Sequence, residues 1–122
     1  MDKMQALHDF WSSFDLPAYD ENTVPANAPY PRITYEAASD GLGGVLPLSA
    51  SIWYWSMSWE EISQKAEEIA EYIENIYPPA TEIDGGRMYI TRETPFAQRM
   101  ADPEPFIRRI LLSVNVEFFT KF

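Results

Sequence analysis

The stretch that most constrains the fold lies near the end of the sequence, at residues 110–118. Apolar side chains occupy every second position there: Ile110, Leu112, Val114, Val116 and Phe118. Because successive side chains of a β-strand point to opposite faces of a sheet, this alternation predicts a long strand with one buried face. Such a strand needs other strands beside it and a layer that covers its apolar face.

Two segments have the helical spacing that could supply this layer. In residues 2–14 the apolar stripe is Met4, Leu7, Trp11 and Phe14, and in residues 58–76 it is Ile62, Ala66, Ile69, Ile73 and Ile76. Both stripes recur every three or four residues, as one face of a helix does. Ser58 followed by Glu61 predicts a capping box at the start of the second helix, and Pro78-Pro79 predicts its end.

Two glycine-rich turns predict hairpins. The first, at 40–44, joins strands at 33–38 and 45–57, and the second, at 84–86, precedes a strand with Met88 and Ile90 facing inward. Proline-bearing stretches at 15–32 and 94–106 are expected to form surface arms or loops, because proline suits neither a helix interior nor a central strand. The expected fold class is therefore α+β. We expect one domain over residues 1–122, in the order helix-strand-strand-helix-strand-strand, with an antiparallel sheet and helices packed on one face.

The composition disfavours several classes of protein. Nineteen acidic and nine basic residues give a formal net charge of −10, which argues against tight binding to nucleic acid. The sequence has no cysteine, which excludes disulfides and a thiolate nucleophile and suggests a reducing compartment. It contains no apolar run of about 18 residues and no secretory signal pattern, so we expect neither a membrane span nor export by that route.

The sequence carries few candidates for catalysis. The single histidine, His8, lies within the first predicted helix, where we expect it to be hydrogen-bonded or exposed rather than catalytic. No metal-binding or phosphate-binding motif appears, so neither a metal nor another cofactor is expected. Glu36 and Glu117 lie on predicted strands, where two carboxylates could pair as they do in glycoside hydrolases. A small hydrolase that uses this pair is one alternative.

The segment SIWYWSMSWEEI, at residues 51–62, concentrates the aromatic residues. Alternation places Ile52 and Tyr54 toward the helices, and Trp59 is expected to cover the start of the second helix. Trp53, Trp55 and Met57 then lie on the opposite face, for which no covering layer is predicted. Exposed aromatic patches of this kind mark interfaces between proteins.

Charged residues suggest two further surfaces. Arginines gather in the second half of the chain: Arg87, Arg92, Arg99, Arg108 and Arg109. Arginine often pairs with acids of a partner, and we expect Arg108 and Arg109 to join the aromatic interface. The second helix carries acids against Lys65 alone: Glu60, Glu61, Glu67, Glu68, Glu71 and Glu74. These acids form either a solvated face or a surface used against DNA or a basic neighbour. The candidates for a channel wall or loop are Asp40, Gly41, Leu42, Gly43, Gly44, Glu67, Glu71 and Glu74.

Five segments, in order and across nearly the whole chain, resemble the small tail terminator, or tail-to-head joining, proteins of long-tailed phages and prophages. They are PYPRITYE, LSASIWYWS, SWEEISQKAEEI, DGGRMYITR and RRILLSVNVEFFTKF. The resemblance implies a mixed α/β fold and a non-enzymatic structural protein of the virion that assembles with itself as a six-membered ring. Its other partners would be the tail tube protein and the head connector protein. DNA would only pass through the ring, without tight binding, and no membrane would be involved.

The resemblance also implies a location: the junction of tail and head in the virion, and the host cytoplasm during assembly. Two other functions remain open beside the hydrolase. One is a neighbouring neck component that connects the head to the tail. The other is an acidic adaptor or inhibitor that imitates the charge of DNA to occupy a host protein.

Overall fold

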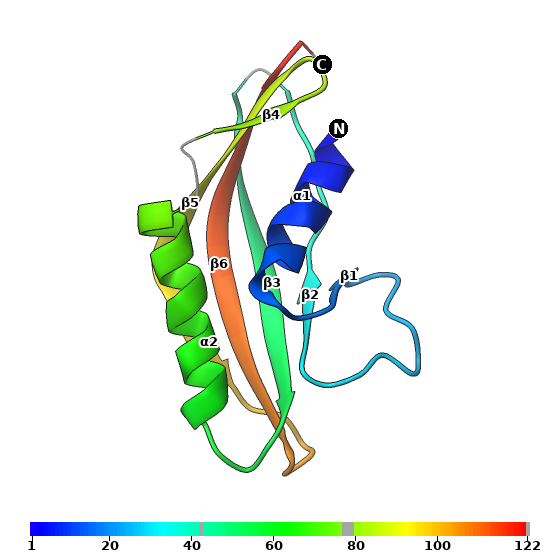
Figure 1. Cartoon of the computed structure of the whole chain (residues 1–122), viewed down its shortest axis with the longest axis vertical. Helices are drawn as coiled ribbons and strands as arrows, with labels where there is room; N and C mark the ends of the chain where they lie inside the picture. Colours follow the sequence, from blue (N-terminus) through cyan, green and yellow to red (C-terminus); the bar gives the residue numbers. More distant parts are fainter. Residues whose placement is uncertain (42, 77–79, 122) are drawn as a thin grey trace.

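The structure is a computed structural model of the chain, and it describes residues 1–41, 43–76 and 80–121 (Figure 1). Two helices, a 3₁₀ turn, a π-helical turn and six strands follow one another along the chain. In order they are α1 (Lys3–Trp11), η1 (Ser12–Phe14), β1 (Ala18–Asp20), β2 (Arg32–Tyr35), β3 (Val45–Trp55), α2 (Glu60–Glu71), η2 (Tyr72–Ile76), β4 (Thr81–Ile83), β5 (Gly86–Met100) and β6 (Ile107–Thr120). The fold is α+β, as the sequence predicts.

The sheet differs from the antiparallel arrangement expected from the sequence. Its six strands lie in the order β1-β2-β3-β6-β5-β4, and β1 runs parallel to β2 while the other neighbours are antiparallel. The extra strand β1 lies inside the stretch 15–32 that we expected to be an arm. Backbone hydrogen bonds from Ile33 to Pro17 and from Glu21 to Tyr35, both 2.9 Å, fix it there. Because β1 is an edge strand, the prolines around it need not donate to a second neighbour.

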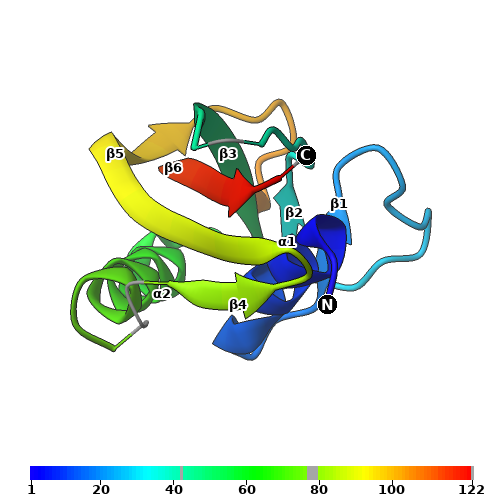
Figure 2. The ribbon, with the colours of Figure 1, turned by 90° about the horizontal axis from the view of Figure 1, so that it is seen from above.

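The second expected arm, at 94–106, is also largely strand. Residues 94–100 belong to β5, and only 101–106 form a loop. Arg92 pairs with Val114 and Ala97 pairs with Leu112, so residues 93–96 lie opposite Ser113 alone. This irregularity accommodates Pro95, which has no backbone N–H to donate. Figure 2 shows the resulting curl of β5 around the sheet.

The two ends of β5 have different neighbours. β4 pairs only with Gly86, Arg87 and Met88, the first three residues of β5. Beyond Met88, no other strand in the part of the chain that the structure describes pairs with the outer edge of β5. A long outer edge of this strand is therefore left without a strand partner.

Both helices pack on one face of the sheet, and one apolar core lies between the layers (Figures 1 and 2). The alternating residues of β6 that the sequence identified are all buried, as are Met88 and Ile90 of β5. In α2 and η2 the predicted stripe is confirmed from Ile62 through Ile73. The side chain of Ile76 and the prolines at 78–79 lie outside the described residues.

The predicted stripe of α1 needs one correction. Leu7, Trp11 and Phe14 are buried as expected, but Met4 is 40% exposed. Ala6 and Phe10 are buried instead. The inward face of the helix is therefore formed by two pairs of neighbouring residues, Ala6-Leu7 and Phe10-Trp11. Met4 falls at the margin of that face because each residue turns the helix by about 100°.

The predicted capping box of α2 does not form. The helix begins at Glu60, and Trp59 is its N-cap residue, without a side-chain bond. The hydroxyl of Ser58 accepts a hydrogen bond from the Glu60 backbone N–H at 3.1 Å. The N–H of Ser58 itself donates to Oγ of Ser56 at 3.0 Å, so it is not available to the side chain of Glu61. A serine turn therefore precedes the helix.

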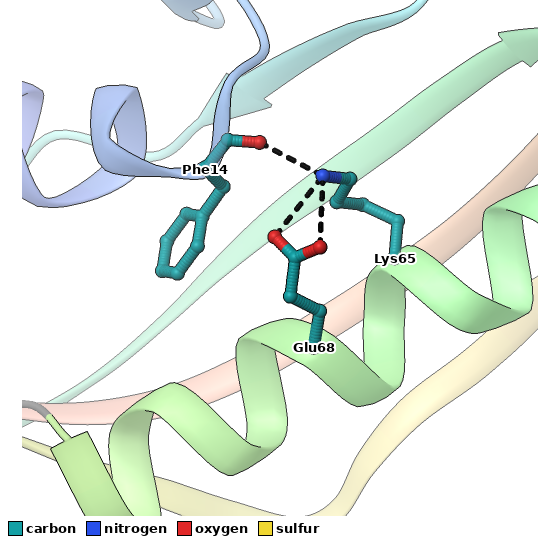
Figure 3. A network of polar contacts seen from close by, with 3 residues as sticks. All are labelled: Phe14, Lys65 and Glu68. Atoms are coloured by element: carbon teal, nitrogen blue, oxygen red, sulfur yellow. Dashed lines mark hydrogen bonds and ion pairs between the residues drawn. The ribbon is translucent and has the colours of Figure 1, made fainter.

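A lysine connects the two helical segments (Figure 3). Lys65 Nζ donates to the carbonyl oxygen of Phe14 at 3.0 Å and to both carboxylate oxygens of Glu68 at 3.0 and 3.2 Å. The ring of Phe14 also meets the ring of Tyr72 edge-on, with centroids 5.1 Å apart. These contacts fix the end of η1 against α2.

Candidate functional site

The expected interface residues meet at one end of the sheet, where β3 ends and β6 begins. The register of the two strands places Trp53 opposite Arg109, Tyr54 opposite Arg108, and Trp55 opposite Ile107. Antiparallel neighbours that face each other across strands share one side of the sheet. Trp53, Trp55 and Arg109 therefore lie on the side without helices, and Arg108 lies on the helical side.

Trp53 is held between two arginines. The guanidinium carbon of Arg109 lies 4.8 Å from the centre of a Trp53 ring, and that of Arg32 lies 5.9 Å away. Arg32 also covers the ring of Tyr30 at 4.2 Å. The indole Nε1 of Trp53 donates to Oγ1 of Thr34 at 2.9 Å. Trp53 is thus half-buried by its own chain, contrary to the expectation that it lies uncovered.

Trp55 and Met57 are uncovered, as predicted. Trp55 is 58% exposed and Met57 is 69% exposed. The Trp55 ring stacks on Phe106 with centroids 5.7 Å apart and an interplanar angle of 16°, and it meets Tyr30 at 5.9 Å. Phe106 is itself 43% exposed. The side without helices therefore ends in a small projecting aromatic patch.

A second tryptophan lies between arginines on the helical side of the same end. The Trp59 ring has Arg99 at 4.9 Å and Arg108 at 5.3 Å from its centre. Arg108 also donates to the carbonyl oxygen of Met57 at 2.8 Å and to that of Pro105 at 3.1 Å. We call the whole region the arginine–tryptophan end. It comprises Tyr30, Arg32, Trp53, Trp55, Met57, Trp59, Arg99, Phe106, Arg108 and Arg109.

The arginines of this end have aromatic rather than acidic neighbours. Within the described residues, no carboxylate lies within ion-pair distance of Arg32, Arg99, Arg108 or Arg109. The Nε atoms of Arg32 and Arg108 are buried and have no hydrogen-bond acceptor. In a chain with a net charge of −10, these four arginines thus form no ion pair with a described carboxylate.

The helix α2 carries a second, acidic surface. Glu60, Glu61, Glu67 and Glu71 are exposed. Two other glutamates are paired: Glu68 contacts Lys65 at 3.0 Å, and Glu74 contacts Arg92 at 2.8 Å. Glu60, Glu67 and Glu71 share one stripe of the helix, because they are seven and four residues apart.

The structure does not bring the loop at 40–44 beside these acids. The carbonyl oxygen of Asp40 accepts from Lys3 Nζ at 3.1 Å, and Gly43 N–H donates to the carbonyl oxygen of Phe118 at 3.0 Å. The loop therefore packs against the start of α1 and the end of β6. Within the loop, the Gly44 N–H donates to the carbonyl oxygen of Gly41 at 3.4 Å, and Leu42 lies outside the described residues. The expected channel residues occupy two separate places.

An apolar cavity between α2 and β5 was not foreseen from the sequence. It measures about 230 Å³ and is lined by Ala66, Glu67 and Ala70 of α2 and by Phe96 and Ala97 of β5, among others. Its shape depends on the irregularity at 93–96, which only the pairing of β5 with β6 reveals. Arg99 also contributes to its wall, so the cavity adjoins the arginine–tryptophan end on the helical side.

The candidate catalytic groups are not assembled into one site. His8 has structural contacts, as expected: Nδ1 lies 3.2 Å from the hydroxyl of Tyr35, and Nε2 lies 3.3 Å from Oγ of Ser12. Glu36 Oε1 accepts from the backbone N–H and hydroxyl of Ser49 at 2.7 and 2.6 Å.

The proposed pairing of Glu36 with Glu117 is wrong. Glu36 lies beside Ser49, whereas Glu117 pairs with Val45, four positions further along β3. At about 3.3 Å per residue this offset alone is roughly 13 Å, which exceeds the carboxylate spacing of glycoside hydrolases.

Among the residues described here, no group of three acids or histidines could hold a metal ion. In the same residues, no helix has the length and apolar character needed to cross a membrane.

Comparison with known proteins identifies the fold but no family. No family model matches the chain, and no curated protein matches it. One solved structure, whose name describes no activity, covers 97% of this chain and 89% of its own length, with a TM-score of 0.53 and 15% sequence identity. At this identity the likeness shows a shared fold alone, over nearly the whole length of both chains.

Proposed function

We propose that the chain is a non-enzymatic structural subunit of a phage virion, a tail terminator. In this role, copies form a ring that caps the tail tube and joins it to the head connector. The observation that carries the proposal is the arginine–tryptophan end, which presents exposed aromatic side chains beside arginines that form no ion pair with a described carboxylate. The five sequence segments that resemble tail terminators supply the biological setting.

The exposed aromatic patch favours a protein that works in an assembly. Trp55 and Met57 are more than half exposed, and tryptophan is a frequent energetic anchor of interfaces. Burying them against another subunit would remove apolar surface from water, at about 25 cal/mol per Å². Arginine stacked on an aromatic ring is also a common interface residue, because its N–H groups stay available to a partner.

The charge of the chain suits a channel through which DNA passes. Binding to DNA phosphates requires lysine or arginine, and the exposed glutamates of α2 provide the opposite charge. A ring with a net charge of −10 per copy would repel DNA along its wall and let it move freely. Its partners would be further copies of the chain, the tail tube protein and the head connector protein, at the junction of tail and head.

Electron microscopy of growing tail tubes tests the proposal. Tail tube protein is polymerised with and without the purified chain, and tube lengths and tube ends are measured. We expect added protein to stop elongation and to appear as density at one end of each tube. Unchanged tube lengths with bare ends would overturn the assignment. Density on the head side alone, with no effect on elongation, would instead identify a neighbouring neck component.

The exposed glutamates also favour a second candidate, an acidic adaptor that imitates DNA. This candidate predicts that the chain competes with DNA for a host protein, and that the complex weakens steeply as salt rises. Competition between labelled DNA and the chain for purified host DNA-binding proteins measures this. A tail terminator would show no such competition.

A further inference from the structure

We infer that Trp55 inserts into the cavity between α2 and β5 of a second copy of this chain, in a head-to-tail contact. The inference deepens the proposed function, on which it rests for the ring, by naming the two surfaces that meet. One surface is the projecting aromatic patch with the arginines beside it. The other is the cavity together with the exposed glutamates of α2.

The first argument is the fit between a projecting group and a hollow. The indole of Trp55 is 58% exposed, and its neighbour Phe106 supports one face of the ring. The cavity of about 230 Å³ is many times the roughly 10 to 15 Å³ that one water molecule needs by the same measure. Ala66, Ala70 and Phe96 give it apolar walls, and Ser63, Glu67 and Arg99 add polar groups to the lining. An apolar hollow of this size is better filled by an aromatic side chain than by water.

The second argument is charge. Arg109 lies two positions from Trp55 in register and uses only Nε, which donates to Oγ of Ser51 at 3.0 Å. Its two Nη groups make no hydrogen bond to the described residues, and its guanidinium carbon lies 4.8 Å from the centre of a Trp53 ring. Glu67 lines the cavity, and Glu71 lies one turn further along α2. A copy docked through Trp55 would bring these carboxylates to unpaired guanidinium groups.

The third argument is position. Trp55 is on the side of the sheet without helices, whereas the cavity is on the helical side, next to α2. A single copy cannot fill its own cavity with its own Trp55. A contact between two different surfaces is heterologous, and repetition of a heterologous contact closes a ring or extends a filament. The arrangement therefore suits a ring or a filament rather than a two-fold dimer, and the proposed function selects the ring.

Two variants separate the two surfaces. Trp55→Ser removes the projecting group and leaves the cavity intact, whereas Ala70→Phe fills the cavity and leaves the projecting group intact. Phe119→Ser is the matched control, because Phe119 is 48% exposed at the opposite end of the same sheet. Circular dichroism and thermal unfolding verify that each variant folds. Light scattering after size-exclusion chromatography, at low salt and high protein concentration, gives the oligomeric state.

We expect the unmodified chain and Phe119→Ser to form oligomers larger than a dimer. Trp55→Ser and Ala70→Phe should each be monomeric alone. When the two are mixed in equal amounts, one functional contact remains possible, so a heterodimer should form and grow no further. Raising the salt from 0.05 to about 0.5 M should weaken association at least tenfold, because charged pairs contribute.

Several outcomes overturn the inference. They are a monomeric unmodified chain at every concentration, oligomers of either variant alone, or a mixture that stays monomeric. Binding of a DNA oligonucleotide that Trp55→Ser abolishes would assign the aromatic patch to nucleic acid instead. The proposed function fails separately. If the variants behave as expected but the unmodified chain leaves tail tubes unaffected, the contact stands and the terminator assignment falls.

Discussion

The backbone carbonyl of Phe14 accepts a hydrogen bond from Lys65 Nζ at 3.0 Å, across 51 residues of sequence. Lys65 is the one cation of α2, and its side chain is only 14% exposed. The bond closes the end of η1 against the second helix, as Figure 3 shows. The bond gives a hydrogen-bond donor to a carbonyl group at the end of the first helical segment. The last carbonyl groups of a helix have no backbone N–H partner within the helix.

Replacing Lys65 by methionine should therefore destabilise the fold. The loss of a charge-assisted hydrogen bond to a carbonyl is expected to cost about 1.5 kcal/mol in the free energy of unfolding. Glu68→Gln is the matched control, because it weakens only the exposed ion pair and should cost less than about 0.5 kcal/mol. Urea denaturation of both variants measures the difference. Equal costs would show that the contact with Phe14 is not the important one.

Two glycines with similar backbone angles should respond differently to alanine. Gly43 has φ +78° and Gly85 has φ +80°, in the region that L-residues avoid. A Cβ at Gly43 would lie 2.5 Å from the Phe119 ring, whereas a Cβ at Gly85 would meet nothing within 4 Å. Gly85→Ala should cost about 1 kcal/mol through backbone strain alone, and Gly43→Ala about 1 to 2 kcal/mol more.

A double variant isolates the contribution of the ring in this comparison. Adding Phe119→Ala to Gly43→Ala removes the obstacle, so the extra cost should largely disappear while the backbone strain stays. Thermal unfolding of the single and double variants provides the coupling energy. Purely additive costs would mean that the loop moves away from Phe119 freely.

Alkaline pH should weaken the fold through Tyr54. Burial raises the pKa of this tyrosine above its ordinary value of 10.0, and Glu61 and Glu68 raise it further. Above pH 10.0 the unfolded chain loses the phenol proton of Tyr54, whereas the folded chain keeps it until a higher pH. The free energy of unfolding therefore falls as the pH rises. Tyr54→Phe should leave stability at pH 7 nearly unchanged and reduce the loss above pH 10. Urea midpoints measured from pH 7 to about 11 test this.

Tyr35 offers a comparison for the same effect. Burial also raises the pKa of Tyr35, followed by the charges of Asp20 and Asp9. Tyr35→Phe should likewise reduce the alkaline loss, but it removes the contact of the hydroxyl with His8 at 3.2 Å. We therefore expect Tyr35→Phe, unlike Tyr54→Phe, to cost about 1 kcal/mol at pH 7.

Two tryptophans should differ sharply in their contribution to stability. Trp11 is 1% exposed in the core, and its replacement by alanine should cost about 4 kcal/mol. Trp55 is 58% exposed, and the same replacement should cost less than about 1 kcal/mol in the monomer. Chemical denaturation at low protein concentration measures both. A large cost at Trp55 would show that this residue serves the fold rather than an interface.

The sequence was most informative where one periodicity runs over many residues. The alternation in β6 and the stripe from Ile62 to Ile73 predicted both buried faces. Each pattern identifies the buried side of its own element, even when the elements that pack against it are not known. The exposure of Trp55 and Met57 followed from the absence of a second helical layer. The capping box was wrong because a local serine, Ser56, had already bonded the N–H of Ser58.

Features that depend on long-range pairing were missed. β1 is only three residues long and lies among prolines, so nothing local identifies it, and it forms because β2 accepts it as a parallel neighbour. The sequence at 94–100 predicts a loop because Pro95 interrupts the strand pattern, whereas in the structure a change of register accommodates the proline. The cavity beside α2 depends on that same change, and Arg32 joins Trp53 only once β2 and β3 are paired.

The unpartnered outer edge of β5 has a consequence for solubility at the concentrations that assembly requires. An exposed strand edge is a template on which foreign strands add and aggregation begins. In β5 the register change at 93–96 divides this edge into two short runs, and Pro95 offers no N–H to an incoming chain. The same irregularity that shapes the cavity therefore also protects the molecule against growth of stacked β-structure.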